Sequence, residues 1–200
     1  MVVSRGKYRG LKIETLSGDQ TRPTSTKVKE AIFSMLHSDV YGARVLDLFA
    51  GSGSLGIEAL SCNAKFVEFY DVSNDAIKII KNNLNKLKCD NYKLELGDYR
   101  KVLRNLTKNN KQYDIIFLDP PYHLHVITEL VCFIYDNNLL AEHGVIVCES
   151  GEDEIVCENY YGIKKKEFSE EKTNKSNYQG LEKYKNKKYG SSIISLYRRV

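Results

Sequence analysis

The sequence of 200 residues lacks the marks of several specialised protein classes. It contains no tryptophan and only three prolines, and its five cysteines include no pair at C-x-x-C spacing. This odd set of cysteines excludes a zinc ribbon and a disulfide framework, and it favours reduced thiols in a cytoplasm. No stretch approaches the roughly 18 apolar residues of a membrane span, and the basic N-terminus predicts no secretory signal. We therefore expect a cytoplasmic protein that does not span a membrane.

What the sequence contains fits one globular domain with a small appendage. Hydrophobic residues make up 42% and charged residues 28%, which excludes a disordered chain. The net charge is +4, and residues 1–30 carry seven Lys or Arg against three acids. Such a basic segment permits a nucleic-acid partner without requiring one. Glycines at 6 and 10 and the alternation over residues 11–14 predict a small β-hairpin, so we expect a basic extension over residues 1–21 and a main domain over 22–200.

The main domain alternates between apolar strands and amphipathic helices. Strands are predicted at residues 45–49, 66–70, 92–96, 115–118 and 144–148. Helices are predicted at residues 25–38, 54–60, 99–106 and 123–136, and a further one is capped by Ser73. This alternation predicts a doubly wound, mostly parallel α/β sheet. In the tail we expect strands at 161–168 and 191–197, paired antiparallel at a sheet edge, and a solvated loop over 164–188.

A glycine-rich turn follows the first predicted strand. Gly51, Gly53 and Gly56 form a G-x-G-x-x-G pattern, in which glycine lets the backbone approach a ligand and expose its amides at a helix N-terminus. Asp71, at the end of the next strand, stands where an acid accepts ribose hydroxyls. The pattern predicts a nucleotide or nucleoside cofactor, although its spacing does not choose between NAD and S-adenosylmethionine. The simpler interpretation is a tight strand–helix turn without a ligand.

Asp47, four residues before the first glycine, favours S-adenosylmethionine. An ionised carboxylate is a poor neighbour for a pyrophosphate, but it suits a ligand whose amino group and sulfonium are both positive. Phe49, in the same turn, is a further candidate for contact with the cofactor. Asp98, after the third strand, has two interpretations: an acceptor for an adenine amino group, or the N-cap of a helix.

A second motif, Asp-Pro-Pro-Tyr, follows the fourth predicted strand at residues 119–122. It lies at the carboxyl edge of the sheet, where open α/β folds bind ligands. The exocyclic amine of a nucleobase is a weak nucleophile, because its lone pair is delocalised into the ring, and two fixed acceptors for its N–H groups make attack easier. Asp119 and the Pro120 carbonyl are such acceptors, and Tyr122 offers a ring on which an extruded base stacks. The simpler interpretation is that the prolines end the strand and Tyr122 packs in the core.

These motifs and their surroundings resemble the bacterial small-subunit rRNA (guanine-N2-)-methyltransferase family. The resemblance is carried by residues 5–10, 22–24, 28–33, 46–61 and 117–122. It implies a Rossmann-like class I methyltransferase fold with a small N-terminal hairpin. It also implies that S-adenosylmethionine is the cofactor and that a guanosine N2 of 16S rRNA, in the small ribosomal subunit, is the target.

The motifs and the resemblance together give an expected site. The catalytic residues are Asp119, Pro120 and Tyr122. The cofactor contacts are Asp47, Phe49, Gly51, Gly53, Asp71 and Asp98, with Glu68 as the alternative to Asp71 for the ribose. The RNA contacts are Arg5, Lys7, Arg9, Arg22, Thr24 and Pro121. We expect a monomer, and no metal ion is needed because positioning and electrostatics suffice for this chemistry.

Other residues and functions compete with this interpretation. The lysines of 164–188 are interpreted as solvation, His123 and His125 as exposed helix residues, and Glu149 is a candidate to line the cleft. An adenine-N6 DNA methyltransferase meets the same chemical demand, but a chain of this length shows no separate domain for reading DNA. A non-catalytic RNA-binding assembly factor would not need the intact tetrad. An NAD-dependent dehydrogenase would leave both Asp47 and the tetrad unexplained.

Overall fold

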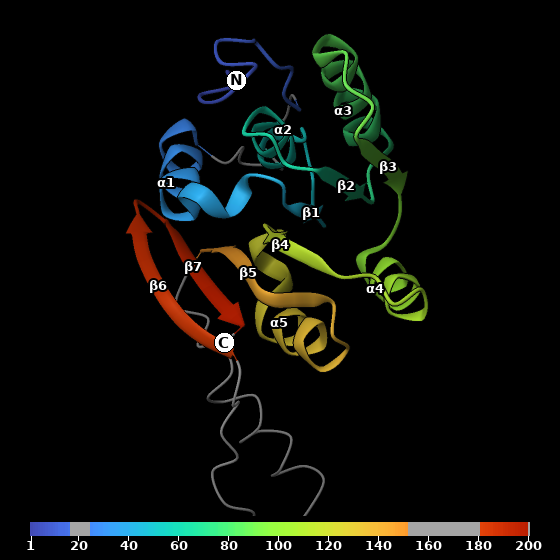
Figure 1. Cartoon of the computed structure of the whole chain (residues 1–200), viewed down its shortest axis with the longest axis vertical. Helices are drawn as coiled ribbons and strands as arrows, with labels where there is room; N and C mark the ends of the chain where they lie inside the picture. Colours follow the sequence, from blue (N-terminus) through green and yellow to red (C-terminus); the bar gives the residue numbers. More distant parts are fainter. Residues whose placement is uncertain (17–24, 152–180, 200) are drawn as a thin grey trace, which may run out of the picture.

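The computed structural model describes residues 1–16, 25–151 and 181–199, and it contains one seven-stranded sheet (Figure 1). The strands are β1 (Arg44–Asp47), β2 (Phe66–Asp71), β3 (Tyr92–Leu96), β4 (Tyr113–Leu118), β5 (Leu140–Ser150), β6 (Leu181–Tyr189) and β7 (Ser192–Arg199). Their order is β3-β2-β1-β4-β5-β7-β6. The first five strands are parallel, and β7 pairs antiparallel with both β5 and β6. The prediction of a mostly parallel α/β sheet is confirmed.

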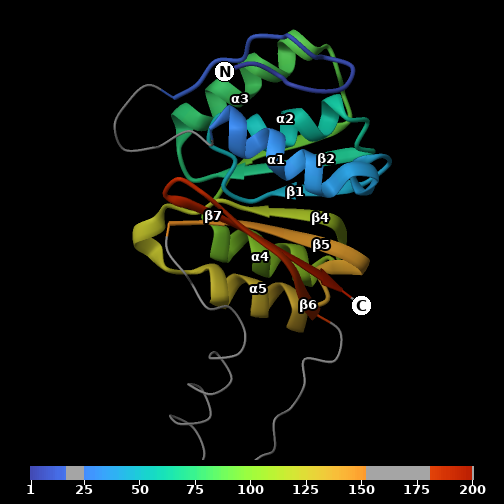
Figure 2. The ribbon, with the colours of Figure 1, turned by 90° about the vertical axis from the view of Figure 1, so that its left-hand side faces the viewer.

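Helices cover both faces of this sheet, as Figure 2 shows. They are α1 (Thr26–Leu36), η1 (His37–Val40), α2 (Ser54–Ser61), α3 (Asn74–Leu87), α4 (Tyr99–Lys108), η2 (Tyr122–Leu124) and α5 (Ile127–Asp136). The apolar sides of α1, α2 and α3 share one buried cluster with the sheet, and those of α4 and α5 share another. Two helical layers around one sheet make the fold doubly wound, because each crossover helix buries its apolar face on the strands that it connects.

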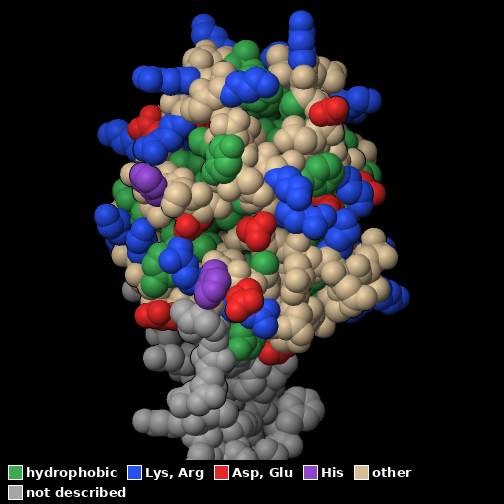
Figure 3. Space-filling model, in the orientation of Figure 1, with side chains coloured by type: hydrophobic (Ala, Val, Ile, Leu, Met, Phe, Trp, Pro, Cys, Tyr) green, Lys and Arg blue, Asp and Glu red, His purple; other side chains and the backbone are tan. Residues whose placement is uncertain are grey.

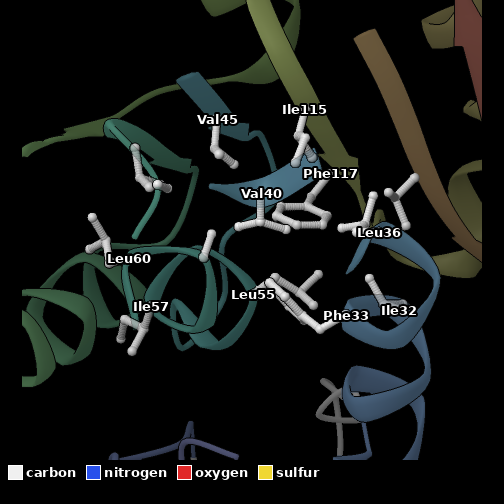
Figure 4. Close-up of a cluster of buried hydrophobic side chains, with 14 of the residues drawn as sticks. Ile32, Phe33, Leu36, Val40, Val45, Leu55, Ile57, Leu60, Ile115 and Phe117 are labelled. Carbon is white, nitrogen blue, oxygen red and sulfur yellow. The ribbon is translucent and has the colours of Figure 1, made fainter. Parts of the chain in front are cut away.

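The larger cluster shows why these segments fold together (Figure 4). The rings of Phe33 in α1 and Phe117 in β4 lie 5.9 Å apart, and Leu55 of α2 lies beside Phe33, whereas Ile57 lies on the other side of that helix. The strands contribute continuously apolar residues, since both of their faces are covered. The helix start predicted at Ser73 is confirmed, because its hydroxyl accepts the amide of Ala76 at 3.4 Å.

The N-terminal segment, residues 1–16, folds back on itself. Val2 and Lys12 form an antiparallel bridge, and the amide of Val3 donates to the carbonyl of Leu11 at 3.0 Å. These contacts close residues 2–12 into a hairpin with one isolated bridge, and the division of the chain into an extension over 1–21 and a main domain stays a prediction. Val3 and Ile13 are buried in the same cluster as α1, α2 and the sheet, so this hairpin shares the core of the main fold.

Two predicted elements differ from the structure. The helix expected at 123–136 is broken: Tyr122–Leu124 is a short 3-10 turn, His125 has a φ of 47°, and α5 begins only at Ile127. The left-handed residue is the physical reason, because it cannot continue a right-handed helix. The loop expected at 164–188 is also wrong over its last part, where Leu181–Tyr189 forms the edge strand β6. An edge strand buries few side chains, so its sequence carries little apolar signal.

The remaining tail predictions have different outcomes. The strand expected at 191–197 is confirmed as β7, and it lies between β5 and β6 rather than at the edge itself. The strand expected at 161–168 lies outside the described residues.

The direction of winding reverses at β1. This strand pairs with β2 on one side and with β4 on the other, so the loops after β1 and β4 leave the sheet at neighbouring positions. Open α/β folds bind ligands at such a switch point, outside the carboxyl ends of the strands.

Candidate active site

The glycine turn, residues 50–56, connects β1 to α2 at this switch point. Gly53 caps α2 with a φ of 77°, a left-handed conformation that glycine adopts without strain. A Cβ on Gly56 would collide with the ring of Phe69 in β2, so the third glycine of the pattern lets α2 pack closely on the sheet. The turn therefore brings the amides at the start of α2 to the carboxyl edge of the sheet.

Asp47, the last residue of β1, is almost completely buried beneath this turn. Its Oδ2 accepts the amide of Gly56 at 2.9 Å, which ties the strand to the helix that follows. Burial raises the pKa of Asp47 to about 7, the hydrogen bond from Gly56 opposes this shift, and the negative charge of Asp71 adds to it. A positively charged ligand beside this carboxylate would lower its pKa again, because it would stabilise the ionised form.

Asp71 fastens the glycine turn from the side of β2. Its Oδ2 accepts the amide of Gly51 at 2.8 Å, and its Oδ1 accepts the amide of Ser73 at 2.8 Å. Glu68, the alternative ribose contact, instead accepts the hydroxyl of Tyr70 at 2.9 Å and the ammonium of Lys111 at 3.2 Å. Of the two acids, Asp71 is the one that adjoins the turn.

Val72 is an exposed apolar residue at the carboxyl edge of the sheet that the sequence analysis does not single out. Its side chain is 74% exposed although it is apolar, and it directly follows Asp71 at the edge of the sheet. Leu96, which pairs with Asp71 across β2 and β3, is 51% exposed. Its place immediately after an acid at the end of a strand is the only feature of the sequence that could have singled it out.

Phe49 and Asp98 border the same region. The ring of Phe49 lies 5.3 Å from that of Tyr99, in a tilted arrangement. Asp98 is the N-cap of α4, and its Oδ1 accepts the amides of Arg100 at 3.0 Å and Lys101 at 3.4 Å. The capping interpretation of Asp98 is therefore correct, and contact with an adenine amino group stays a prediction.

The tetrad begins where β4 ends. Asp119 is half-buried, Pro120 is buried and Pro121 is exposed. Asp47 pairs with Phe117 across β1 and β4, and the amide of Leu48 donates to the Phe117 carbonyl at 3.4 Å. The glycine turn and the tetrad therefore leave the sheet side by side.

The hydroxyl of Tyr122 contacts β5 and β7, the two strands that follow β4 in the sheet. It donates to Oε1 of Glu149 in β5 at 3.3 Å and lies 3.0 Å from Oγ of Ser192 in β7. Burial raises the pKa of the Tyr122 hydroxyl, the hydrogen bond with Ser192 opposes this, and the Glu149 and Asp119 carboxylates add to it. Glu149, a candidate to line the cleft, thus contacts the tetrad through Tyr122, whereas Ser192 had no sequence signal because it lies 70 residues from Tyr122. His123 and His125 are exposed, as expected.

The N-terminal segment is held on α2 by two polar side chains of that helix. The carboxylate of Glu58 accepts the amide of Ser4 at 2.9 Å and that of Arg5 at 2.7 Å, and it forms an ion pair of 2.6 Å with Lys29 of α1. Both members of this pair are 0% exposed. Ser61 accepts the amide of Tyr8 through its hydroxyl at 2.9 Å.

These contacts place the loop of the segment at the surface. Arg5, Lys7 and Arg9 are exposed there, and Figure 3 shows Lys and Arg side chains over the N-terminal segment and α1. Arg22 and Thr24, two further expected RNA contacts, lie outside the described residues. No local pattern predicts the Lys29–Glu58 pair, because each residue stands alone within a helical pattern.

The described residues contain neither a metal-binding cluster nor a membrane-spanning helix. No group of three or more His, Cys, Asp or Glu residues there is arranged to hold a metal ion. Within the same ranges, no helix has the length and apolar character needed to cross a membrane.

Known proteins resemble this chain over most of its length. The family described as "Conserved hypothetical protein 95" matches residues 1–178. The protein named ribosomal RNA small subunit methyltransferase D of Haemophilus influenzae is 35% identical over 164 residues, which make up 80% of this chain and 85% of that protein. The chain belongs to the family described as "Conserved hypothetical protein 95". The resemblance carried by its motifs is thereby confirmed.

Further members agree in sequence and in structure. A putative rRNA methyltransferase of Bacillus subtilis is 39% identical over 150 residues, 74% of this chain and 82% of that protein. A solved structure of a putative methyltransferase from Escherichia coli has a TM-score of 0.77 at 26% identity. The match covers 100% of this chain and 97% of the chain in that structure. A putative methylase from Haemophilus influenzae has a TM-score of 0.74 at 27% identity, covering 100% and 98%. The fold is that of a class I methyltransferase.

Proposed function

We propose that the chain uses S-adenosylmethionine to methylate the N2 amine of a guanosine in 16S rRNA, within the small ribosomal subunit or an assembly intermediate. The observation that carries this proposal is the register between β1 and β4, which sets the glycine turn beside Asp119. A methyl donor held by the turn and an amine held by the tetrad would meet at one edge of the sheet. The names of the relatives, which are rRNA methyltransferases, support the substrate class.

The residues around the glycine turn fit S-adenosylmethionine. The carboxylate of Asp71 would accept the ribose hydroxyls, and the exposed side chain of Val72 would cover a face of the adenine. Phe49 and Asp98 border the same space, with Asp98 placed to accept from the adenine amino group. Asp47 and the backbone of Gly51 and Gly53 would hold the positively charged methionine end. When bound, the cofactor supplies a methyl group on a positively charged sulfur.

The tetrad would prepare the amine for attack. The carboxylate of Asp119 and the carbonyl of Pro120 accept its two N–H groups, which favours a pyramidal nitrogen and stabilises the positive charge that develops on it. Both acceptors are fixed before the substrate arrives, because Pro120 is buried and restricts the backbone. The ring of Tyr122 stacks on the extruded base, a contact worth roughly 1–3 kcal/mol.

The substrate RNA would lie along the basic N-terminal segment. Arg5, Lys7 and Arg9 are exposed on a loop that α2 holds rigidly, so their charges would meet the phosphate backbone from a fixed position. Pro121 is exposed beside the tetrad. We assign Arg22 and Thr24 to the same RNA surface on the strength of the family resemblance.

One experiment tests the target. Purified protein is incubated with labelled S-adenosylmethionine and small subunits that lack the modification, or with duplex DNA, and the products are digested to nucleosides for mass spectrometry. We expect N2-methylguanosine from the subunits and no N6-methyladenine from the DNA, with Asp119→Asn protein as the control for contaminating enzymes. N6-methyladenine would refute the guanine assignment, and absence of S-adenosylhomocysteine with every RNA would favour a non-catalytic assembly factor.

A second measurement separates the cofactors. Native mass spectrometry of the protein with S-adenosylhomocysteine and with NAD shows directly which of the two binds. Retention of NAD alone would contradict the proposal, since Asp47 would then face a pyrophosphate.

A further inference from the structure

We infer that Ser192 and Glu149 are positioning residues that hold the ring of Tyr122 in the orientation in which it stacks on the target base. This role rests on the function proposed above and adds residues that none of its motifs contains. It is carried by a group of hydrogen bonds that joins three elements distant in sequence: η2, which holds Tyr122, β5, which holds Glu149, and β7, which holds Ser192.

The hydroxyl of Tyr122 is engaged on both sides. It donates to Oε1 of Glu149 at 3.3 Å, and its distance to Oγ of Ser192 is 3.0 Å. A phenol has one proton, and Tyr122 gives it to Glu149, so Ser192 is the donor in the second hydrogen bond. Glu149 is 5% exposed and Ser192 is 6% exposed, so water competes little for either contact.

The ring of Tyr122 has a close backbone neighbour as well. A Cβ added to Gly151, the residue after β5, would lie 2.7 Å from Cδ2 of Tyr122. The chain therefore passes against the ring at a distance that only glycine allows. With its hydroxyl bound and the ring in contact with the backbone, the side chain cannot turn without losing these contacts.

Such an anchor has a physical purpose, because η2 is too short to fix the side chain by itself. The turn has three residues, and its backbone is closed by the amide of Leu124 donating to Pro121 at 3.0 Å and that of His125 donating to Tyr122 at 3.2 Å. These bonds leave the side-chain torsions of Tyr122 undetermined. A base that stacks on a mobile ring must also immobilise it, whereas a ring fixed during folding adds no such cost at binding.

The same contacts separate the roles of ring and hydroxyl. The proton of the hydroxyl is directed at Glu149, and burial raises the pKa of Tyr122, so the phenol is not placed to exchange a proton with the substrate amine. The hydroxyl acts as the attachment point, and the ring is the part that meets the base.

Three variants test this role: Ser192→Ala, Tyr122→Phe and the double variant. The control is Ser195→Ala, because Ser195 lies in the same strand, is 6% exposed, and its hydroxyl is 3.5 Å from Asn186 rather than near Tyr122. We measure kcat/KM for methyl transfer to small subunits lacking the modification, and the affinity for S-adenosylhomocysteine by calorimetry. Loss of one hydrogen bond changes an equilibrium or rate constant by up to about tenfold, so we expect each single variant to lose roughly 3- to 10-fold in kcat/KM.

The double variant carries the decisive comparison. If Ser192 acts through the hydroxyl, Ser192→Ala costs nothing further in the Tyr122→Phe background, whereas independent effects would multiply. The affinity for S-adenosylhomocysteine is expected to stay unchanged in every variant, and Ser195→Ala is expected to match the wild type. Glu149→Gln, which keeps an acceptor oxygen, is expected to lose less than Glu149→Ala.

Two results would overturn the positioning role: losses in kcat/KM that multiply in the double variant, or a Ser192→Ala protein no slower than Ser195→Ala.

NMR relaxation of selectively 13C-labelled tyrosine rings measures the mobility of the Tyr122 ring without substrate, and Tyr122→Phe identifies its signal. We expect the ring of Tyr122 to become more mobile in Ser192→Ala and not in Ser195→Ala. Wild-type protein that methylates no RNA would refute the proposed function instead, while the ring measurement would still decide whether Tyr122 is anchored.

Discussion

Replacing Glu58 by glutamine is expected to destabilise the protein by about 3–5 kcal/mol, the usual effect of removing one partner of a buried ion pair. The carboxylate of Glu58 is 0% exposed and pairs with the ammonium of Lys29 at 2.6 Å. Without it, Lys29 keeps the carbonyl of Val2, at 2.8 Å, as a neutral acceptor for a buried charge. The amide nitrogen of the glutamine would also face a donor in either orientation: the ammonium of Lys29 if the amide oxygen takes the place of Oε1, or the amides of Ser4 and Arg5 if it takes the place of Oε2.

Thermal unfolding measures this effect directly. In a domain of 150–250 residues each kcal/mol moves Tm by roughly 2–4 °C, so the variant is expected to melt about 6–20 °C below the wild type. The matched control is Glu95→Gln, whose pair with Lys93 is 3.0 Å long but 48% and 37% exposed, and which is expected to change stability by less than about 1 kcal/mol. Adding Lys29→Met to Glu58→Gln should recover part of the loss, because it removes the uncompensated charge. A Glu58→Gln protein that melts with the Glu95→Gln control would refute the reasoning.

Three further predictions follow from the glycine turn and the basic segment. Burial raises the pKa of Asp47 from 3.8 to about 7, so the free energy of unfolding falls as pH rises through this interval. In urea titrations we therefore expect the free energy of unfolding of Asp47→Asn, relative to the wild type, to be higher at pH 8 than at pH 4. An equal difference at both pH values would contradict this. Gly56→Ala is expected to cost about 1–3 kcal/mol in thermal unfolding through the collision with Phe69, and an unchanged Tm would show that the contact relaxes. Lys7→Ala and Arg9→Ala should each reduce the salt dependence of RNA binding by about one ion, with cofactor affinity unchanged; an unaltered salt slope would remove these residues from the RNA surface.

Local patterns in the sequence predicted the elements that carry the chemistry. Continuous apolarity located β1 and β4, and the acids and glycines that follow these strands marked the edge of the sheet before the register was known. Ser73 was found as a cap because its signal is confined to a few residues. Each of these features depends on neighbours in the chain.

Contacts between distant residues could not be predicted in this way. Nothing near Glu58 indicates that it binds Lys29 and the backbone of Ser4, and nothing near Ser192 indicates that it binds Tyr122. The helix break at His125 was missed because its φ of 47° occurs at a residue other than glycine, so no local signal marks it. The edge strand β6 was missed because its exposed lysines resemble a loop, although they are also typical of a protected sheet edge.

The central claim is that Asp119 activates the amine while other residues hold the methyl donor. Its most direct test compares Asp119→Ala with the wild type in two assays: methyl transfer to small subunits that lack the modification, and calorimetric binding of S-adenosylhomocysteine. We expect transfer to fall by orders of magnitude, about 10²-fold or more, with binding unchanged. Equal loss of transfer and binding, or transfer close to the wild-type rate, would contradict the claim.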